Sequence, residues 1–237
     1  MTNYDQNPAI SGAAVGGAAA LDAGLRRYML RIYNYMAAGV GVTAVVAWLT
    51  YRLTGPALLH SPLMWVFILA PLALVFFLSA RINTLSATAA RALFFVYAAL
   101  VGVSLSTLLH VYTSYSITRV FFIAAGMFGA ISIFGYTTRR DLSGFGTFLF
   151  MGLIGIIIAG VVNLFLRSTQ LDWLISVIGV GVFAGLTAYD TQRIKAMYDR
   201  ADNELSAARK SIIAALSLYL NFINLFLMML RLAGGRR

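Results

Sequence analysis

The sequence predicts an all-α, polytopic membrane protein, a bundle of seven transmembrane helices. Of its 237 residues, 60% are hydrophobic and only 11% are charged, whereas soluble domains have about 45–50% apolar and about 25% charged residues. Apolar segments near the ~20 residues that cross a ~30 Å hydrocarbon layer follow one another along the chain, and basic residues mark their ends. A soluble fold of this size could not bury so much apolar surface, so lipid is the expected solvent.

The N-terminal part differs in composition from the rest of the chain. Residues 1–20 are rich in Ala, Gly and Asn, and such a segment cannot form a packed core. From Leu21 onward apolar residues recur at helical spacing, which favours an interfacial helix. We therefore expect a mobile N-terminal segment and the start of that helix over 1–24, and a single membrane domain over 25–237. A signal peptide is not expected, because the first long apolar stretch begins about thirty residues in.

The seven transmembrane segments are predicted in order from the apolar runs. They lie at about 32–50, 63–80, 92–110, 119–136, 146–166, 171–189 and 211–230. Most connections are short, so consecutive helices are expected to be antiparallel neighbours. The exception is 190–210, which we expect to be a hydrophilic loop of mixed charge.

The Lys and Arg residues predict an orientation in the membrane. Of the 18, twelve fall on the side of the N-terminus and six on the other, so the N-terminus is expected in the cytoplasm and the C-terminus outside. Three of those six, however, lie in the C-terminal tail. A seventh segment that re-enters the membrane and returns this tail to the cytoplasm is therefore an alternative.

Composition and motifs exclude several classes of function. The net charge is +10, but the cations stand singly or in small groups between apolar runs, so no nucleic-acid partner is expected. Cysteine is absent, which excludes disulfides and thiolate metal sites. No cofactor or metal-binding fingerprint appears, and no acids accompany His60 or His110. We expect no catalytic residue, cofactor or metal site, and hence not an enzyme; an intramembrane hydrolase would need a second acid or a Ser–His pair.

Polar residues inside apolar segments are the candidates for function, because polar groups are costly in lipid. Ser217, Asn221 and Asn224 follow one another at i, i+4 and i+7 in segment seven, a spacing that places them on one stripe of the helix. The amides could simply hold helices together. We favour the alternative, a polar stripe that faces a water-filled pathway.

Asp190 is the acid closest to this stripe. It lies in GLTAYDTQRIK, residues 185–195, at the end of segment six, and a carboxylate at this depth needs a partner. Arg193 could form a local pair three residues further on. Arg81, expected at the same end of segment two, is the other candidate.

The same residues carry a resemblance to a known family. GLTAYDTQRIK at 185–195 and ALSLYLNFINLFLMMLRL at 215–232 resemble the Bax inhibitor-1 family. Further matches lie at 70–82, 97–106 and 134–146, so that the similarity covers roughly 25–232. The resemblance is to bacterial members, which implies the inner (plasma) membrane. It also implies a bundle whose last helix is central and encircled by the other six, and a role in calcium leak across membranes.

The resemblance further implies a pH sensor made of two aspartates and a competing arginine. Asp190 matches the first aspartate and Arg81 is the match for the arginine, but Asn221 stands where the family commonly has the second aspartate. With one carboxylate, the repulsion that makes such a pair sensitive to pH is missing. We therefore expect weak pH sensing and a hydrogen bond between Asp190 and Asn221 that ties segments six and seven together.

Two functions remain open. The first is an ion pathway or gate formed by Asp190, Asn221, Arg81, Asn224 and Ser217, with calcium ions as the transported partner. The second is a regulator without flux of its own, whose partner is a membrane protease or another part of membrane-protein quality control. The N-terminal segment and the charged loop would be its contact surfaces.

Overall fold

The computed structural model describes residues 8–55, 61–82 and 84–235, and only the backbone of 8–22 and 79. Its elements are α1 (Pro8–Thr54), α2 (Leu63–Arg81), α3 (Ala87–Leu105), α4 (Leu108–Val111), α5 (Ser114–Thr137), α6 (Ser143–Leu166), α7 (Thr169–Ala196) and α8 (Glu204–Ala233). Every element of the described residues is a helix, as predicted. Six spans are long and apolar enough to cross a membrane, and α2 supplies a shorter apolar helix.

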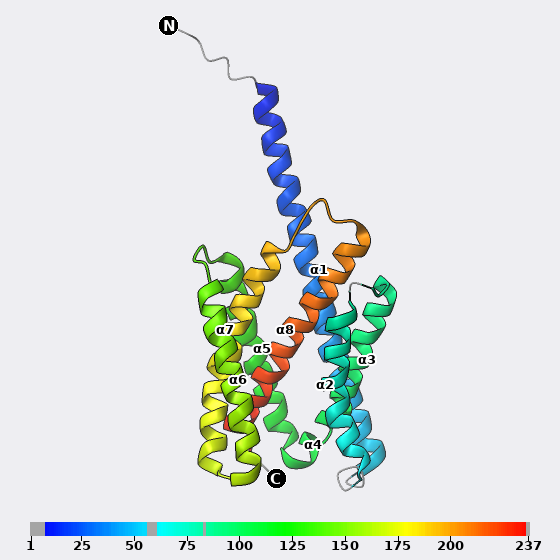
Figure 1. The fold of residues 1–237 in the computed structure, drawn as a ribbon, viewed down its shortest axis with the longest axis vertical. Helices are drawn as coiled ribbons and strands as arrows, with labels where there is room; N and C mark the ends of the chain where they lie inside the picture. Colours follow the sequence, from blue (N-terminus) through cyan, green and yellow to red (C-terminus); the bar gives the residue numbers. More distant parts are fainter. Residues whose placement is uncertain (1–7, 56–60, 83, 236–237) are drawn as a thin grey trace.

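The long helices run alternately up and down the bundle (Figure 1). The start of α1 and the end of α8 lie at opposite ends of the structure, and α8 runs from one end of the bundle to the other. The last helix therefore passes through the bundle instead of turning back. The cytoplasmic position of the N-terminus stays a prediction.

The connection between the last two helices is shorter than the sequence predicts. The prediction of a hydrophilic loop over 190–210 is wrong at both ends, because α7 continues to Ala196 and α8 begins at Glu204. Long basic side chains can extend from a helix to reach polar partners, and Lys195 donates to the carbonyl of Tyr136 at 2.8 Å. Asn203 caps α8 by accepting a hydrogen bond from the backbone N–H of Ser206 at 2.8 Å, which satisfies a free N–H of the first turn.

Two other boundaries differ from the prediction. The expected interfacial helix is continuous with the first span, since α1 begins at Pro8; the mobility predicted for 1–24 remains a prediction, and residues 1–7 lie outside the described part. The third segment breaks into α3 and α4 at Ser106 and Thr107. Their hydroxyls donate to the carbonyls of Val103 and Ser104, bonds that compete with the helix.

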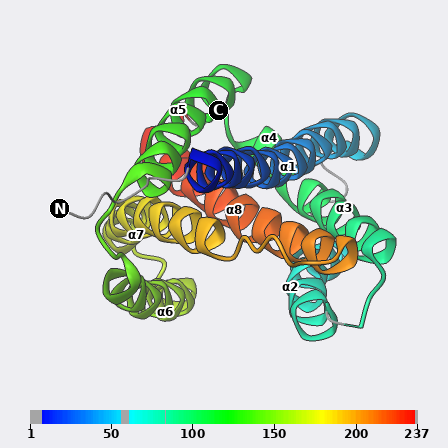
Figure 2. The same ribbon diagram turned by 90° about the horizontal axis from the view of Figure 1, so that it is seen from above.

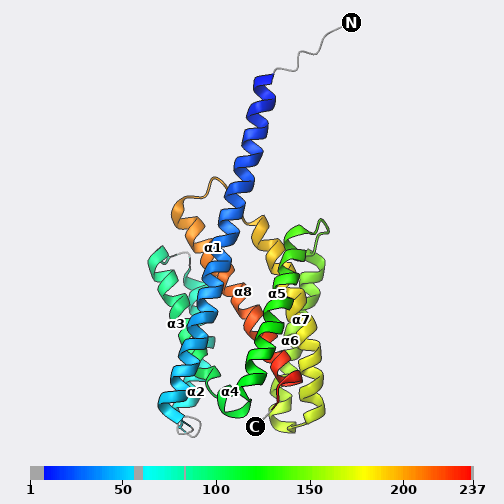
Figure 3. The same cartoon turned by 180° about the vertical axis from the view of Figure 1, so that it is seen from behind.

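Helix α8 forms the core of the bundle. In its most apolar stretch 67% of the residues are buried, against 6% in α6. It packs against α1, α3, α5 and α7, whereas α2 packs mainly on α3 and α6 mainly on α7 (Figure 2). The last helix is thus central, as the resemblance implies, but four helices, rather than six, make most of the contacts with it. Seen from behind, α1 and α5 stand on either side of α8 (Figure 3).

Candidate functional site

The acid of the site, Asp190, is buried in α7 with 3% of its surface exposed. Its Oδ2 atom accepts hydrogen bonds from the Ser217 hydroxyl at 2.9 Å and from the Asn221 side-chain amide at 2.8 Å. Both donors belong to α8 and lie one turn apart, so they approach the same oxygen from one face of the helix. The predicted hydrogen bond between Asp190 and Asn221 is therefore present.

Arg193 provides the charge that compensates Asp190. Its guanidinium lies 3.0 Å from the other carboxylate oxygen, Oδ1, in an ion pair between residues three apart on α7. That oxygen makes no regular hydrogen bond, and the Nε atom of Arg193 is likewise buried without a hydrogen-bond partner. The guanidinium also lies 5.7 Å from the ring centre of Tyr189. Because the Arg193 side chain is 40% exposed and that of Asp190 only 5%, the pair connects the interior with the surface of the bundle.

Two of the predicted site residues lie apart from Asp190. Arg81 is exposed at the end of α2, a helix that packs mainly on α3, and the structure pairs Asp190 with Arg193 instead. The side-chain amide of Asn224 donates to the carbonyl of Leu220 in its own helix at 2.9 Å. The structure thus brings together Asp190, Ser217 and Asn221 of the five predicted residues.

A second polar contact on α8 was not foreseen from the sequence. The Thr43 hydroxyl of α1 lies 2.6 Å from the hydroxyl of Tyr219, which is fully buried. Thr43 also donates toward the carbonyls of Gly39 and Ala98, so Tyr219 is the donor in their shared bond. Single hydroxyls in apolar runs form no pattern, which is why this contact escaped prediction.

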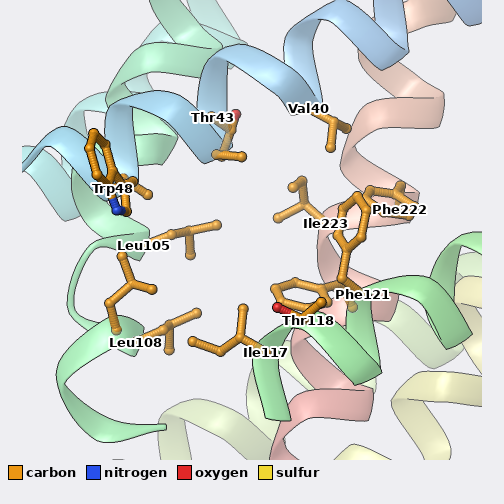
Figure 4. Close-up of a pocket in the computed structure, with 14 residues that line it drawn as sticks. Val40, Thr43, Trp48, Leu105, Leu108, Ile117, Thr118, Phe121, Phe222 and Ile223 are labelled. Atoms are coloured by element: carbon orange, nitrogen blue, oxygen red, sulfur yellow. The ribbon is translucent and has the colours of Figure 1, made fainter. Parts of the chain in front are cut away.

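An apolar hollow among the described residues lies away from the acid. It has a volume of about 250 Å³ and is lined by residues of α1, α3, α4, α5 and α8. Its lining is almost entirely apolar, with the aromatic rings of Trp48, Phe121 and Phe222 among the side chains (Figure 4). Neither Asp190 nor Asn221 belongs to it. Within the described residues no three His, Asp or Glu side chains gather as metal ligands.

Fold and site together define a class: a polytopic helical membrane protein with a buried acid that is bonded to an amide of its central, last helix. The chain belongs to the Bax inhibitor-1 family. The family model described as inhibitor of apoptosis-promoting Bax1 matches residues 25–237, which confirms the resemblance noted from the sequence.

Several bacterial proteins are similar over nearly the whole chain. Inner membrane protein YbhL of Escherichia coli (strain K12) is 50% identical over 222 residues, which cover 91% of this chain and 94% of that protein. An uncharacterised protein of Rickettsia prowazekii (strain Madrid E) is 46% identical over 218 residues, covering 91% and 92%. An uncharacterised membrane protein of Streptococcus pyogenes serotype M3 is 38% identical over 220 residues, covering 90% and 94%. The names of the Escherichia coli and Streptococcus pyogenes relatives place those two proteins in membranes, and none of the three names gives an activity.

Proposed function

We propose that the protein is a calcium-leak pathway of the bacterial inner membrane, without enzymatic activity, and that Asp190 is its cation-attracting group. The observation that carries the proposal is the buried Asp190 carboxylate held by the central helix. Asp190 is the one acid among the buried polar side chains of the described residues, and carboxylates attract cations in membrane pathways. The name of YbhL and the distribution of Lys and Arg support an inner-membrane location with a cytoplasmic N-terminus.

In this arrangement Arg193 acts as a competitor for the passing cation. While its guanidinium lies against Asp190, the negative charge is compensated and attracts no second cation. Release of Arg193 would leave a carboxylate with only the neutral donors of Ser217 and Asn221. Leak would therefore depend on the fraction of molecules in which the ion pair is open. Arg193 here has the role of the competing arginine, which the family resemblance implies for Arg81.

The test is calcium flux into liposomes that contain the full-length protein and a calcium dye, measured between about pH 5 and about pH 8. We expect shallow pH dependence for the wild type, because one carboxylate has no like-charged neighbour to hold a proton. The variant Asn221→Asp should become steeply pH-dependent, since two carboxylates within hydrogen-bond distance titrate as a pair. Asn224→Asp is the matched control, an amide-to-acid change on the same helix whose amide bonds to its own backbone.

Two results would count against this proposal. If the flux of the wild type depends steeply on pH and Asn221→Asp leaves this dependence unchanged, then Asp190 does not determine the response to pH. Absence of calcium flux at every pH would exclude the leak itself.

The second candidate, a regulator of a membrane protease, is favoured by one feature. Helix α1 begins at Pro8 and projects beyond the bundle (Figure 1), where a partner could contact it. Deletion of residues 1–20 separates the two candidates, because a leak through the bundle should survive it. Regulation through the projecting helix should be lost, which protease activity in a co-reconstituted membrane would reveal.

A further inference from the structure

A basic hollow lies at the end of the bundle from which α1 projects, between the α5–α6 turn and the last turns of α7 (Figure 1). It has a volume of about 370 Å³. Its lining residues are Arg139, Arg140, Asp141, Ser143, Tyr189, Gln192, Arg193 and Ala196. Three arginines and one aspartate thus belong to its lining.

The turn that carries two of these arginines is fixed in position by Gln192. The amide nitrogen of this side chain donates to the carbonyl of Arg140 at 2.8 Å, and its oxygen accepts from the backbone N–H of Leu142 at 2.9 Å. Both ends of the side-chain amide are therefore used on one turn. The fold fixes the shape of the hollow, because the same helix, α7, carries the Gln192 side chain that holds the turn and the third arginine, Arg193.

The charge of the hollow is positive at neutral pH. Asp141 accepts a hydrogen bond from the backbone N–H of Ser143 at 2.9 Å, and hydrogen bonds from Ser143 lower the pKa of Asp141 below its usual value. Its carboxylate is ionised and offsets one of the three guanidinium charges, and Asp190 offsets that of Arg193, so that one positive charge remains while this ion pair is closed. The remaining charge suits an anion, and the planar, multiply donating guanidinium suits a phosphoryl group in particular.

The surface below the hollow is apolar. Tyr189 packs against Phe150 of α6 with ring centres 6.2 Å apart, and on the same helix Phe145 and Phe148 are exposed. In a membrane these rings face acyl chains. A ligand that filled the hollow and covered this surface would combine an anionic head with an apolar tail.

We propose that this hollow binds the phosphoryl head group of an anionic phospholipid. Arg139 and Arg140 are exposed and available to the phosphate oxygens. The Arg193 side chain lines the hollow and is 40% exposed, so its accessible N–H groups can donate to a phosphate oxygen. Basic pockets of this kind between transmembrane helices bind acidic head groups.

Occupation of the hollow also affects the candidate site, because Arg193 belongs to both. A phosphoryl group competes with the Asp190 carboxylate for the same guanidinium, which now lies 3.0 Å from Asp190. Acidic lipid should thus open the ion pair and increase leak. This second step rests on the proposed function, whereas binding of the head group does not.

The test is native mass spectrometry of the full-length protein in neutral detergent, titrated with phosphatidylglycerol, phosphatidylcholine of the same acyl chains, or inorganic phosphate. We expect phosphatidylglycerol to bind in preference to the other two, and the double variant R139Q/R140Q to bind it roughly tenfold more weakly, since two charged contacts are lost. The control R26Q/R27Q removes two neighbouring arginines of α1 at the same end and should bind as the wild type does. Q192L keeps every arginine but frees the turn, and should weaken binding severalfold.

The outcomes discriminate clearly. An equal loss of lipid binding in R139Q/R140Q and in R26Q/R27Q would show attraction to general surface charge and would contradict the proposed site. Equal binding of phosphatidylglycerol and phosphatidylcholine would contradict it as well. Tight binding of inorganic phosphate alone would assign the hollow to a free anion instead of a lipid. If phosphatidylglycerol binds as expected but no calcium flux is seen under any condition, the head-group site stands and the leak function fails.

Discussion

Asp190 is the residue on which the stability of the site depends. An ionised carboxylate in an apolar interior is tolerated only when it is paired and hydrogen-bonded, and here Ser217, Asn221 and Arg193 share that task. The three donors come from two helices. Removing one donor should therefore affect both local stability and the packing of α7 against α8.

The first prediction concerns the amide donor. Asn221→Ala should lower the free energy of unfolding by about 1–3 kcal/mol, because it leaves a buried carboxylate oxygen with one donor fewer. Asn224→Ala should have a smaller effect, since the Asn224 amide donates to a backbone carbonyl of its own helix and not to a charged group. Reversible unfolding of the two variants in detergent mixtures gives the comparison. Equal losses would mean that the bond to Asp190 contributes nothing specific.

The second prediction concerns the cation. Arg193→Gln should destabilise the protein by about 1–3 kcal/mol, less than a fully buried ion pair would lose, because the Arg193 side chain is 40% exposed to solvent. Asp190→Asn in the same chain should restore much of the loss, as no charge is then left unpaired. Arg81→Gln should change little. A larger effect at Arg81 would favour the arginine that the family resemblance suggested.

At the scale of the element, α8 is attached on two faces. Asn221 and Ser217 hold it to α7, and Tyr219 holds it to Thr43 of α1. The Tyr219 ring packs edge-on against Phe94 and Tyr97 of α3. The hydroxyl contact is therefore set in a closely packed aromatic cluster.

The third prediction follows from the direction of this hydroxyl bond. Tyr219→Phe should cost about 1 kcal/mol, because the ring stays and Thr43 keeps its carbonyl acceptors. Thr43→Val should cost more, about 1–3 kcal/mol, because the buried Tyr219 hydroxyl is then left without its acceptor. The same unfolding assay measures both. The reverse order would mean that Thr43 is the donor.

The fourth prediction concerns the approach of α5 to α7. A Cβ atom on Gly135 would overlap the carbonyl oxygen of Ala188 and lie 2.9 Å from its Cα, so Gly135→Ala must push the two backbones apart. We expect a loss of about 1–3 kcal/mol. Gly126→Ala in the same helix meets nothing within 4 Å and serves as the control. If both variants unfold alike, the close contact is not required.

The sequence predicted the elements better than their ends. Length and apolarity located the six long spans and the shorter α2, because a lipid layer imposes both. The sequence predicts the end of α7 too early, because the polar residues after Asp190, such as Gln192 and Lys195, have the composition of a loop. These side chains instead bond to the α5–α6 turn and to α5 from a continuing helix, a tertiary contact that a pattern cannot contain.

The site was predictable only in part for a similar reason. The spacing of Ser217 and Asn221 placed them on one stripe, and the cost of a charge in lipid required a partner for Asp190. Which arginine it would be depends on the depth and packing of α2, and the sequence left Arg81 and Arg193 as alternatives. The Gln192 clamp gave no signal, since one glutamine in a basic segment is ordinary.

At the scale of the whole molecule, the helices form two groups. Helices α1, α2 and α3 pack together, as do α5, α6 and α7, and α8 lies between them (Figures 1 and 3). Each polar attachment of α8 joins it to one group. A parting of the two groups must therefore break the attachment of α8 to one of them.

The placement of these two attachments determines which motions the molecule resists. Ser217 and Tyr219 are two positions apart, about 200° around the helix axis, so their side chains leave α8 in nearly opposite directions. A twist of α8 about its own axis would strain both attachments at once, whereas a sideways parting of the halves strains one. We therefore expect α8 to move as a rigid unit with one group of helices while the other group moves away from it.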